Sequence, residues 1–326
     1  NIGQAHPPHR QLTENWSEMV NIEEWEVLWC SEGFVEARER LRKQLPKWCH
    51  LRVAEPALSL REQVANAAVL VPAAAHITAE VLNAASRLRL VAQPAAGYEH
   101  IDVKACKARG IPVCVGRGVS SQSVAEGIMC AMMAMAKRLP AQMRAFQDRL
   151  PGATIGMQMT GKQLGIIGMG DIGRALAAMA RAFSMTVEGV SSSSPRAELE
   201  RLLRTSDFVS INCPLSDATR GLIGRQELAM MKPGAFLVNF ARGPIVDRQA
   251  LEEKLEETGG LSGVALDVHW EEPLWDPSQP LYSDPRVLSL PHCGFSTEEV
   301  YDGLVSLVVR NIAASREGGD LVNRVC

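Results

Sequence analysis

The sequence predicts an α/β protein with two doubly wound parallel sheets, and three observations point to this fold class. The chain has 326 residues, about twice the usual size of one domain. From Trp25 onward, short apolar runs rich in β-branched residues alternate with helical patterns, which is typical of βαβ units. Near the middle of the chain, an apolar run leads through a glycine-rich turn into a helical segment.

The first series of predicted elements makes one small α/β unit. Each predicted strand is a short apolar run, and each predicted helix carries apolar residues three or four positions apart. The last of these helices ends at Gly110, a residue that favours helix termination. Strands are expected at 26–31, 50–56, 67–73, 89–95 and 111–116, and helices at 34–45, 77–88 and 104–110.

A long helical pattern at 120–150 separates this unit from the rest of the chain. We expect it to break at Pro140, because proline removes a helical hydrogen bond. Its many Met and Ala residues favour packing in a core or against a second subunit. A second series then predicts strands at 162–168, 185–191, 207–213, 235–241, 263–268 and 287–292, followed by a helix at 297–316.

Composition and charge exclude several functional classes. The chain has 34 Lys+Arg, 37 Asp+Glu, a formal net charge of −3 and 46% hydrophobic residues, so neither a disordered chain nor a polycationic nucleic-acid binder is expected. The eight cysteines lack CxxC or zinc-finger spacing, which predicts free thiols and no metal site. The most apolar stretch, 124–139, contains Glu126 and Lys137 and is shorter than the roughly 20 residues that cross a bilayer, so no membrane span is expected.

The N-terminal residues bear on the expected cellular location of the protein. The chain begins with Asn1 rather than Met, and segment 1–10 has no apolar signal core. We expect a cytoplasmic location, or an organelle stroma or matrix if a transit peptide has been removed. No role is predicted for residues 1–20.

The glycine-rich turn has the spacing GxGxxG, at Gly168, Gly170 and Gly173. Gly168 would allow the tight turn, Gly170 would let the main chain approach a pyrophosphate, and Gly173 would let helix and strand pack closely. Asp171 and Ile172 lie inside the turn, where a helix N-terminus offers free N–H groups to an anion. The flanking strand and helix patterns favour a dinucleotide site over an ordinary βα turn.

The end of the next predicted strand bears on which dinucleotide binds. An NAD site usually has an Asp or Glu here for the adenosine ribose, whereas this chain has Ser191, Ser192 and, four residues later, Arg196. Hydroxyl groups and a guanidinium can hold a 2′-phosphate that a carboxylate would repel, so we expect NADP in preference to NAD. The alternative is a polar surface loop with a helix-capping serine before Pro195, which leaves the preference open.

Three further motifs follow in order: NFARGPIVD at 239–247, LDVHWEEP at 266–273 and LPH at 290–292. Together with the glycine turn, their order and spacing resemble the D-isomer-specific 2-hydroxyacid dehydrogenases, which include glyoxylate and hydroxypyruvate reductases. The resemblance extends from about Val53 to the C-terminal helix.

This resemblance implies how the chain divides into domains. A flavodoxin-like substrate-binding domain would be formed by residues 1–117 and 297–326, and a Rossmann dinucleotide-binding domain by residues 118–296. The chain would cross between the domains twice, with the ligands in the cleft between them.

The resemblance also implies a catalytic triad whose chemistry suits reduction of a 2-keto acid. Arg242 would pair with the substrate carboxylate and carbonyl, because a planar guanidinium offers a fork of donors. His292 would protonate the carbonyl oxygen, while Glu272 would bind the other imidazole nitrogen and favour the charged ring. The main-chain N–H groups of Ala96 and Gly97 would hold the substrate carboxylate.

Further cofactor contacts are implied by the same matching. They comprise a loop after a strand, two residues that flank the nicotinamide and an acceptor for its carboxamide. These residues are, in that order, Cys213, Pro214 and Thr219, then Phe240 and Ala241, and finally Asp267.

Three neighbouring residues are poorer candidates. His269 and Glu271 share a motif with Glu272, but the matching position of the catalytic acid is immediately before Pro273. Cys293 follows His292, yet neighbours in an extended segment point to opposite sides, so a nucleophilic Cys-His pair is not expected.

The expected function is hydride transfer between a nicotinamide cofactor and a small 2-keto or 2-hydroxy acid, such as glyoxylate, hydroxypyruvate or a phenylpyruvate-like compound. Segment 71–74, expected near the substrate side chain, is uncharged and argues against phosphorylated or dicarboxylate substrates. One alternative is a nucleotide-sensing corepressor or scaffold, which the same fold also resembles. Another is a formate or phosphite dehydrogenase, which would need a basic group near Ala73.

Overall fold

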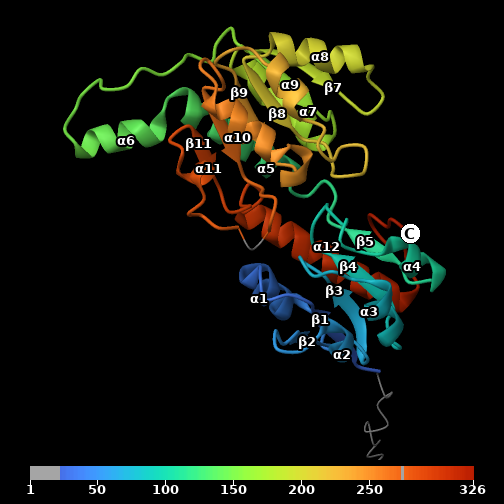
Figure 1. Cartoon of the computed structure of the whole chain (residues 1–326). Coiled ribbons are helices and arrows are strands. Elements are labelled where there is room, and N and C mark those ends of the chain that lie inside the picture. Colours follow the sequence, from blue (N-terminus) through green and yellow to red (C-terminus); the bar gives the residue numbers. More distant parts are fainter. Residues whose placement is uncertain (1–22, 273–274) are drawn as a thin grey trace, which may run out of the picture.

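The computed structural model describes residues 23–272 and 275–326, and it confirms the predicted α/β class with two parallel sheets (Figure 1). The expectations for residues 1–20, and the motif residue Pro273, lie outside the described residues. Each sheet is built from strands that pair in parallel, so the carboxyl ends of its strands lie along one edge.

The first sheet has the strand order β2-β1-β3-β4-β5, which is the flavodoxin-like winding. Successive residues Val69 and Leu70 belong to different apolar clusters, so both faces of the sheet are buried. The elements of this part are β1 (Trp25–Trp29), α1 (Val35–Gln44), β2 (Cys49–Val53), α2 (Leu60–Gln63), β3 (Ala67–Val71), α3 (Ala79–Ala84), β4 (Leu90–Gln93), α4 (Val103–Ala108) and β5 (Val113–Val115).

The second sheet has the strand order β11-β10-β9-β8-β6-β7, again with apolar clusters on both faces. From β6 the chain first winds to β7 on one side and then returns to β8 on the other. The elements are α5 (Ser121–Ala136), α6 (Leu139–Gln147), β6 (Gln163–Ile167), α7 (Asp171–Ala182), β7 (Thr186–Val190), α8 (Arg196–Thr205), β8 (Phe208–Ile211), α9 (Arg225–Met230), β9 (Phe236–Asn239), the 3₁₀ helix η1 (Gly243–Ile245), α10 (Arg248–Glu256), β10 (Gly263–Leu266), α11 (Pro280–Ser283), β11 (Val287–Ser289) and α12 (Glu298–Glu317).

The last helix, α12, leaves the second sheet and packs against α1 and β4 of the first (Figure 1). Its residues Val305, Val308 and Ile312 are buried in the same apolar cluster as Trp29. Beyond the helix, the Val325 N–H donates to the Val113 carbonyl over 2.8 Å, so the C-terminal residues extend the edge of the first sheet.

The long helical pattern does divide, but not at the predicted residue. The break lies at Arg138, whose φ of 51° is left-handed, and Pro140 sits in the first turn of α6. Proline is tolerated there because the first N–H groups of a helix have no intrahelical acceptor. The methionines of α5 are core residues: Met129, Met132 and Met135 are buried against the second sheet.

In the ranges described, no helix is both long enough and apolar enough to cross a bilayer. All eight cysteines fall within these ranges, and each is a free thiol.

Asp207, which precedes β8, links the starts of β6 and β8 through a hydrogen bond. Its carboxylate accepts a hydrogen bond from the Gln163 N–H over 2.8 Å and pairs with the Lys232 ammonium. Burial opposes ionisation of this carboxyl, but the hydrogen bonds and the charge of Lys232 outweigh it and hold its pKa below the ordinary value. Ionised Asp207 therefore contributes to the stability of the second sheet.

We expect Asp207→Asn to lower the free energy of unfolding by about 1 kcal/mol at pH 7. Because the folded pKa is depressed, this contribution is present above the unfolded pKa of about 3.9 and is lost as the pH falls through the folded value. Urea unfolding at pH 7, 5 and 3.5 should show a deficit of the variant that is equal at pH 7 and 5 and smaller at pH 3.5. Asp320→Asn, at an exposed position, serves as the control. A deficit that is unchanged at low pH would contradict the assignment.

Candidate active site

The glycine-rich turn lies where the second sheet changes its winding direction, between the carboxyl ends of β6 and β8. Gly168 has a φ of 106°, and a Cβ there would stand 2.6 Å from the Cys213 nitrogen. A Cβ on Gly173 would stand 2.2 Å from the Gly168 carbonyl oxygen. These two glycines are required for close packing of the main chain. Ligands of open α/β sheets bind at such a switch point.

Gly170 differs from Gly168 and Gly173, because a Cβ on Gly170 would have no protein atom within 4 Å. It directly precedes α7, whose first residues Asp171 and Ile172 present main-chain N–H groups at the positive end of the helix. Open space over a glycine beside a helix N-terminus fits the pyrophosphate of a dinucleotide.

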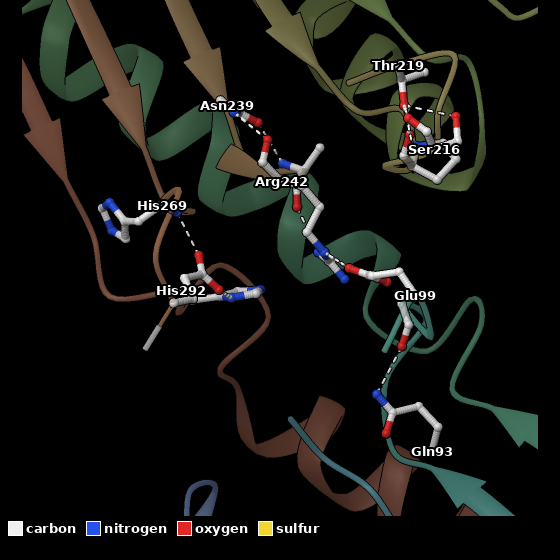
Figure 2. Close-up of polar contacts among 12 residues, drawn as sticks. Gln93, Glu99, Ser216, Thr219, Asn239, Arg242, His269 and His292 are labelled. Carbon is white, nitrogen blue, oxygen red and sulfur yellow. Dashed lines mark hydrogen bonds and ion pairs between the residues drawn. The ribbon is translucent and has the colours of Figure 1, made fainter. Parts of the chain in front are cut away.

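The loop after β8 closes on itself through Thr219. The Thr219 hydroxyl donates to the Pro214 carbonyl over 2.7 Å and accepts from the Ser216 N–H over 2.8 Å (Figure 2). The Cys213 nitrogen lies beside Gly168, and Thr219 holds the loop that carries Cys213 and Pro214.

The residues after β7 lie next to the glycine turn, since the Gly168 N–H donates to the Val190 carbonyl over 2.8 Å. Ser191 and Ser192 are exposed, and the Ser191 hydroxyl is 2.9 Å from that of Ser193. Arg196 begins α8, where its guanidinium pairs with Glu227 and, over 3.4 Å, with Glu200.

His292, which follows β11, and Glu272, which follows β10, contact each other. The His292 Nδ1 atom lies 2.7 Å from Glu272 Oε2, while Glu272 Oε1 accepts from the His269 N–H over 2.7 Å (Figure 2). Burial opposes ionisation of Glu272, but its bond to His292 and the charge of that ring keep its pKa below the ordinary value. Glu272 is therefore a fixed, ionised acceptor for one imidazole nitrogen.

The extended backbone expected at His292 is wrong, because its φ is 54°. An extended backbone therefore does not exclude Cys293 as a nucleophile. Burial and the nearby Asp267 carboxylate raise the pKa of the Cys293 thiol, which disfavours the thiolate that a nucleophile needs.

His269 has a structural role in this part of the chain. It is buried, with Nε2 2.8 Å from the Leu290 carbonyl and Nδ1 3.2 Å from the Tyr282 hydroxyl. Because a carbonyl only accepts, Nε2 carries a proton, and the tyrosine can donate to Nδ1. The ring thereby joins the loop after β10 to the segment that leads to His292.

Asp267 anchors the loop that follows His292. Its two carboxylate oxygens accept from the N–H groups of Cys293, over 2.7 Å, and Gly294, over 2.9 Å. Burial raises the pKa of Asp267, while these hydrogen bonds act against the rise. The sequence pattern connects Asp267 only with a carboxamide and gives no signal of its contact with the loop.

The ring of Phe240 is buried in the core against α5, 3.2 Å from the place of a Cβ on Gly127. The Ala241 N–H donates to Asn239 Oδ1 over 3.1 Å, and Asn239 Nδ2 donates to the Arg242 carbonyl over 2.9 Å. Asn239 thus fixes the turn that presents Arg242. Asn239 is not among the site residues predicted from the sequence, although its place at the carboxyl end of a predicted strand is a signal that could have identified it.

Arg242 reaches from the second sheet to the loop after β4. Its Nε atom donates to Glu99, and its Nη1 atom donates to the Ala241 carbonyl over 2.7 Å (Figure 2). The Nη2 atom lies against Gly97, 1.9 Å from where a Cβ would stand, so a side chain at this position would displace the guanidinium. Gly97 therefore lies beside the Arg242 guanidinium.

Glu99 was not identified from the sequence. Burial opposes its ionisation, but the hydrogen bond and charge of Arg242 hold its pKa below the ordinary value. The two residues are 143 positions apart, so spacing alone gave no signal that they meet.

Comparison with known proteins identifies the family. A profile for the NAD binding domain of D-isomer specific 2-hydroxyacid dehydrogenase matches residues 128–294. A glyoxylate reductase from Thermococcus litoralis is 36% identical over 267 residues, which cover 75% of this chain and 80% of the relative. The solved TT0316 protein from Thermus thermophilus has a TM-score of 0.83 at 33% identity and covers 92% of this chain and 100% of that one. A glyoxylate reductase structure from Paecilomyes thermophila has a TM-score of 0.79 at 28% identity, covering 93% and 98%.

The chain belongs to the D-isomer-specific 2-hydroxyacid dehydrogenase family and is an NAD(P)-dependent dehydrogenase with an NAD-binding domain. The reductases among its relatives do not favour the corepressor alternative. Among the residues that the structure describes, His, Cys, Asp and Glu side chains form no group of three or more suited to a metal ion.

We expect Gly170→Ala to weaken NADPH binding about tenfold or more while leaving the cofactor-free protein as stable as the wild type. The added methyl group meets no protein atom, but it enters the space proposed for the pyrophosphate. Fluorescence titration and thermal unfolding measure the two effects. Gly224→Ala is a matched control, because Gly224 also precedes a helix and its Cβ would make an ordinary 3.4 Å contact. Wild-type affinity in Gly170→Ala would contradict the site.

Proposed function

We propose that this dehydrogenase is an NADPH-preferring reductase of small 2-keto acids such as glyoxylate or hydroxypyruvate. The observation that carries the proposal is the His292–Glu272 pair, at 2.7 Å, which lies in the same region as Arg242 (Figure 2). The charge of Arg242 contributes to the lowered pKa of Glu272, in keeping with a shared site. Glyoxylate reductases among the relatives support the substrate class.

The three residues would divide the chemistry. Arg242, with the N–H groups of Ala96 and Gly97, would hold the substrate carboxylate. His292 would donate a proton from Nε2 to the carbonyl oxygen during reduction and take it back during oxidation. Glu272 would keep the ring oriented through Nδ1 and favour its charged form. The bound nicotinamide supplies or accepts the hydride.

The cofactor would lie along the carboxyl ends of β6, β8, β9 and β10. The glycine turn would bind the pyrophosphate, the loop after β8 would border the cofactor, and main-chain atoms after β9 would flank the nicotinamide. Asp267 would accept from the carboxamide with lone pairs that its loop contacts leave free. In chain order the proposed contacts are Gly168, Gly170, Asp171, Ile172, Gly173, Ser191, Ser192, Arg196, Cys213, Pro214, Thr219, Phe240, Ala241 and Asp267.

We assign substrate binding to the domain formed by 1–117 and 297–326, of which 1–22 are outside the described residues, and dinucleotide binding to 118–296. The return of α12 to β4 and α1 supports this division.

A homodimer is part of the proposal. Helix α6 and the segment after it project from the second domain (Figure 1). There Phe146 is 80% exposed and Ile155 is 87% exposed. Apolar side chains on a projecting arm suit burial by a second copy. A solution mass of one chain would contradict the homodimer.

The eight free thiols support a reducing compartment, which we propose to be the cytoplasm or an organelle stroma or matrix.

NADPH preference is supported by the residues after β7. Hydroxyl groups of Ser191 and Ser192 occupy the position where NAD sites usually carry a carboxylate. Glu188, the nearest carboxylate along this strand, pairs instead with Arg201. Arg196 would exchange its contacts with Glu200 and Glu227 for a 2′-phosphate.

The ratio of kcat/KM with NADPH to that with NADH is expected to exceed one in the wild type. Ser191→Asp should lower the ratio about tenfold or more, because its carboxylate repels a 2′-phosphate and can accept from a ribose hydroxyl. Ser86→Asp, at an exposed serine between α3 and β4 of the first sheet, is the control. A wild-type preference for NADH would refute the NADPH assignment.

We expect the wild type to reduce members of a 2-keto acid panel, followed by NADPH absorbance. His292→Ala should lose about 10²–10⁴-fold in kcat in both directions, since it removes the proton donor, while retaining cofactor binding. His50→Ala, at a half-exposed histidine of the first sheet, should match the wild type. Cofactor binding without turnover of any panel member, or full activity in His292→Ala, would defeat the proposal.

A further inference from the structure

The contact between Arg242 and Glu99 links the two sheets at the proposed substrate site. Arg242 follows β9, whereas Glu99 lies in the loop after β4. A resident carboxylate on an arginine that is proposed to bind a substrate carboxylate could act in two ways. It could compete with the substrate, or it could hold the arginine in place for the substrate.

The contacts of the three guanidinium nitrogens show how Glu99 engages Arg242. Nε donates to Glu99 (Figure 2), and Nη1 donates to the Ala241 carbonyl over 2.7 Å. Nη2 lies against Gly97, 1.9 Å from the place of a Cβ, and Glu99 Oε2 lies 2.9 Å from the same place. Glu99 accepts from Nε, while Nη2 faces the proposed Ala96–Gly97 carboxylate site.

The buried side chain of Gln93 holds the loop that carries Glu99. Gln93, at the end of β4, is 3% exposed, and its Nε2 atom donates to the carbonyls of Gly97, over 2.9 Å, and Ala73, over 3.1 Å. The Ile101 N–H donates to the Tyr98 carbonyl over 3.0 Å. Glu99 is thus attached to a fixed loop, as positioning of another residue requires.

The contact also determines the charge of the site. Arg242 keeps Glu99 ionised by lowering its pKa, so the pair has no net charge. Burial lowers the pKa of neighbouring His100, which favours its neutral form near pH 7. The adjoining segment 71–74 contains no charged residue. Little positive charge is left over for a second anionic group on the substrate.

We propose that Glu99 is a positioning and specificity residue: it holds the Arg242 guanidinium with Nη2 facing the carboxylate site, and it neutralises Arg242 so that substrates with one negative charge are preferred. The inference rests on the proposed function, because it assumes that Arg242 binds the substrate carboxylate. Glu99 acts through Arg242 and takes no part in proton or hydride transfer.

The test compares wild type, Glu99→Gln and Glu99→Asp with saturating NADPH. Glyoxylate reports binding of a single carboxylate. 2-Oxopentanoate and 2-oxoglutarate, of equal chain length but carrying one and two negative charges, report charge selectivity as substrates or as competitive inhibitors. Glu23→Gln, which removes the exposed ion pair with Arg87, is the matched control. Thermal unfolding verifies that each variant is folded.

Glu99→Gln should raise KM for glyoxylate about tenfold with little change in kcat, because the guanidinium binds the carboxylate equally in ground and transition states. Selectivity for 2-oxoglutarate over 2-oxopentanoate should rise about tenfold, because Arg242 regains its net charge. Glu99→Asp keeps the charge on a shorter side chain, so it should raise KM yet keep wild-type charge selectivity.

A fall in KM in Glu99→Gln would identify Glu99 as a competitor of the substrate and overturn the inference. Unchanged charge selectivity in Glu99→Gln, or altered selectivity in the folded Glu99→Asp variant, would also overturn it. A wild type that reduces no 2-keto acid would instead contradict the proposed function. An active wild type that Glu99→Gln matches in both KM and selectivity would contradict only the role of Glu99.

Discussion

Parallel pairing of the strands is the constraint on which the site depends. In a parallel ladder all strands point the same way, so the residues that follow them gather along one edge. Gly168 follows β6, Cys213 follows β8, and Arg242 follows β9 by a few residues. Asp267 follows β10 directly, and His292 comes shortly after β11. Residues spread over more than a hundred positions thereby become neighbours without a specific long-range signal in the sequence.

Three carboxylates then position the groups that this edge brings together. Glu272 holds His292, Asp267 holds the loop just beyond it, and Glu99 holds Arg242. In each case a carboxyl group accepts from an N–H donor, and for Glu272 and Glu99 the lowered pKa keeps the acceptor charged, which gives stronger contacts than neutral pairs. The arrangement restricts the orientation of the imidazole and guanidinium before any ligand arrives, which reduces the ordering needed on binding.

The sequence predicted those features that local patterns specify. Apolar runs located the strands, and the glycine spacing located the turn at Gly168, where the closeness of Cys213 allows no side chain. The left-handed residue Arg138 carried no such pattern, so the helix break was placed two residues late at Pro140. The left-handed backbone of His292 has no sequence signature either, so the sequence predicts an extended residue there. The Glu99–Arg242 contact depends on how two domains meet, which neither local segment encodes.

The path of α12 has a consequence for how the protein is made. The apolar cluster around Trp29 is completed by Val305, Val308 and Ile312, and the edge at β5 is extended by Val325. During synthesis the first sheet therefore leaves the ribosome long before its own core can close. The second domain, made later, has all its strands before α12 begins. The half of the protein that is translated first therefore cannot complete its core until the half that is translated later has been made.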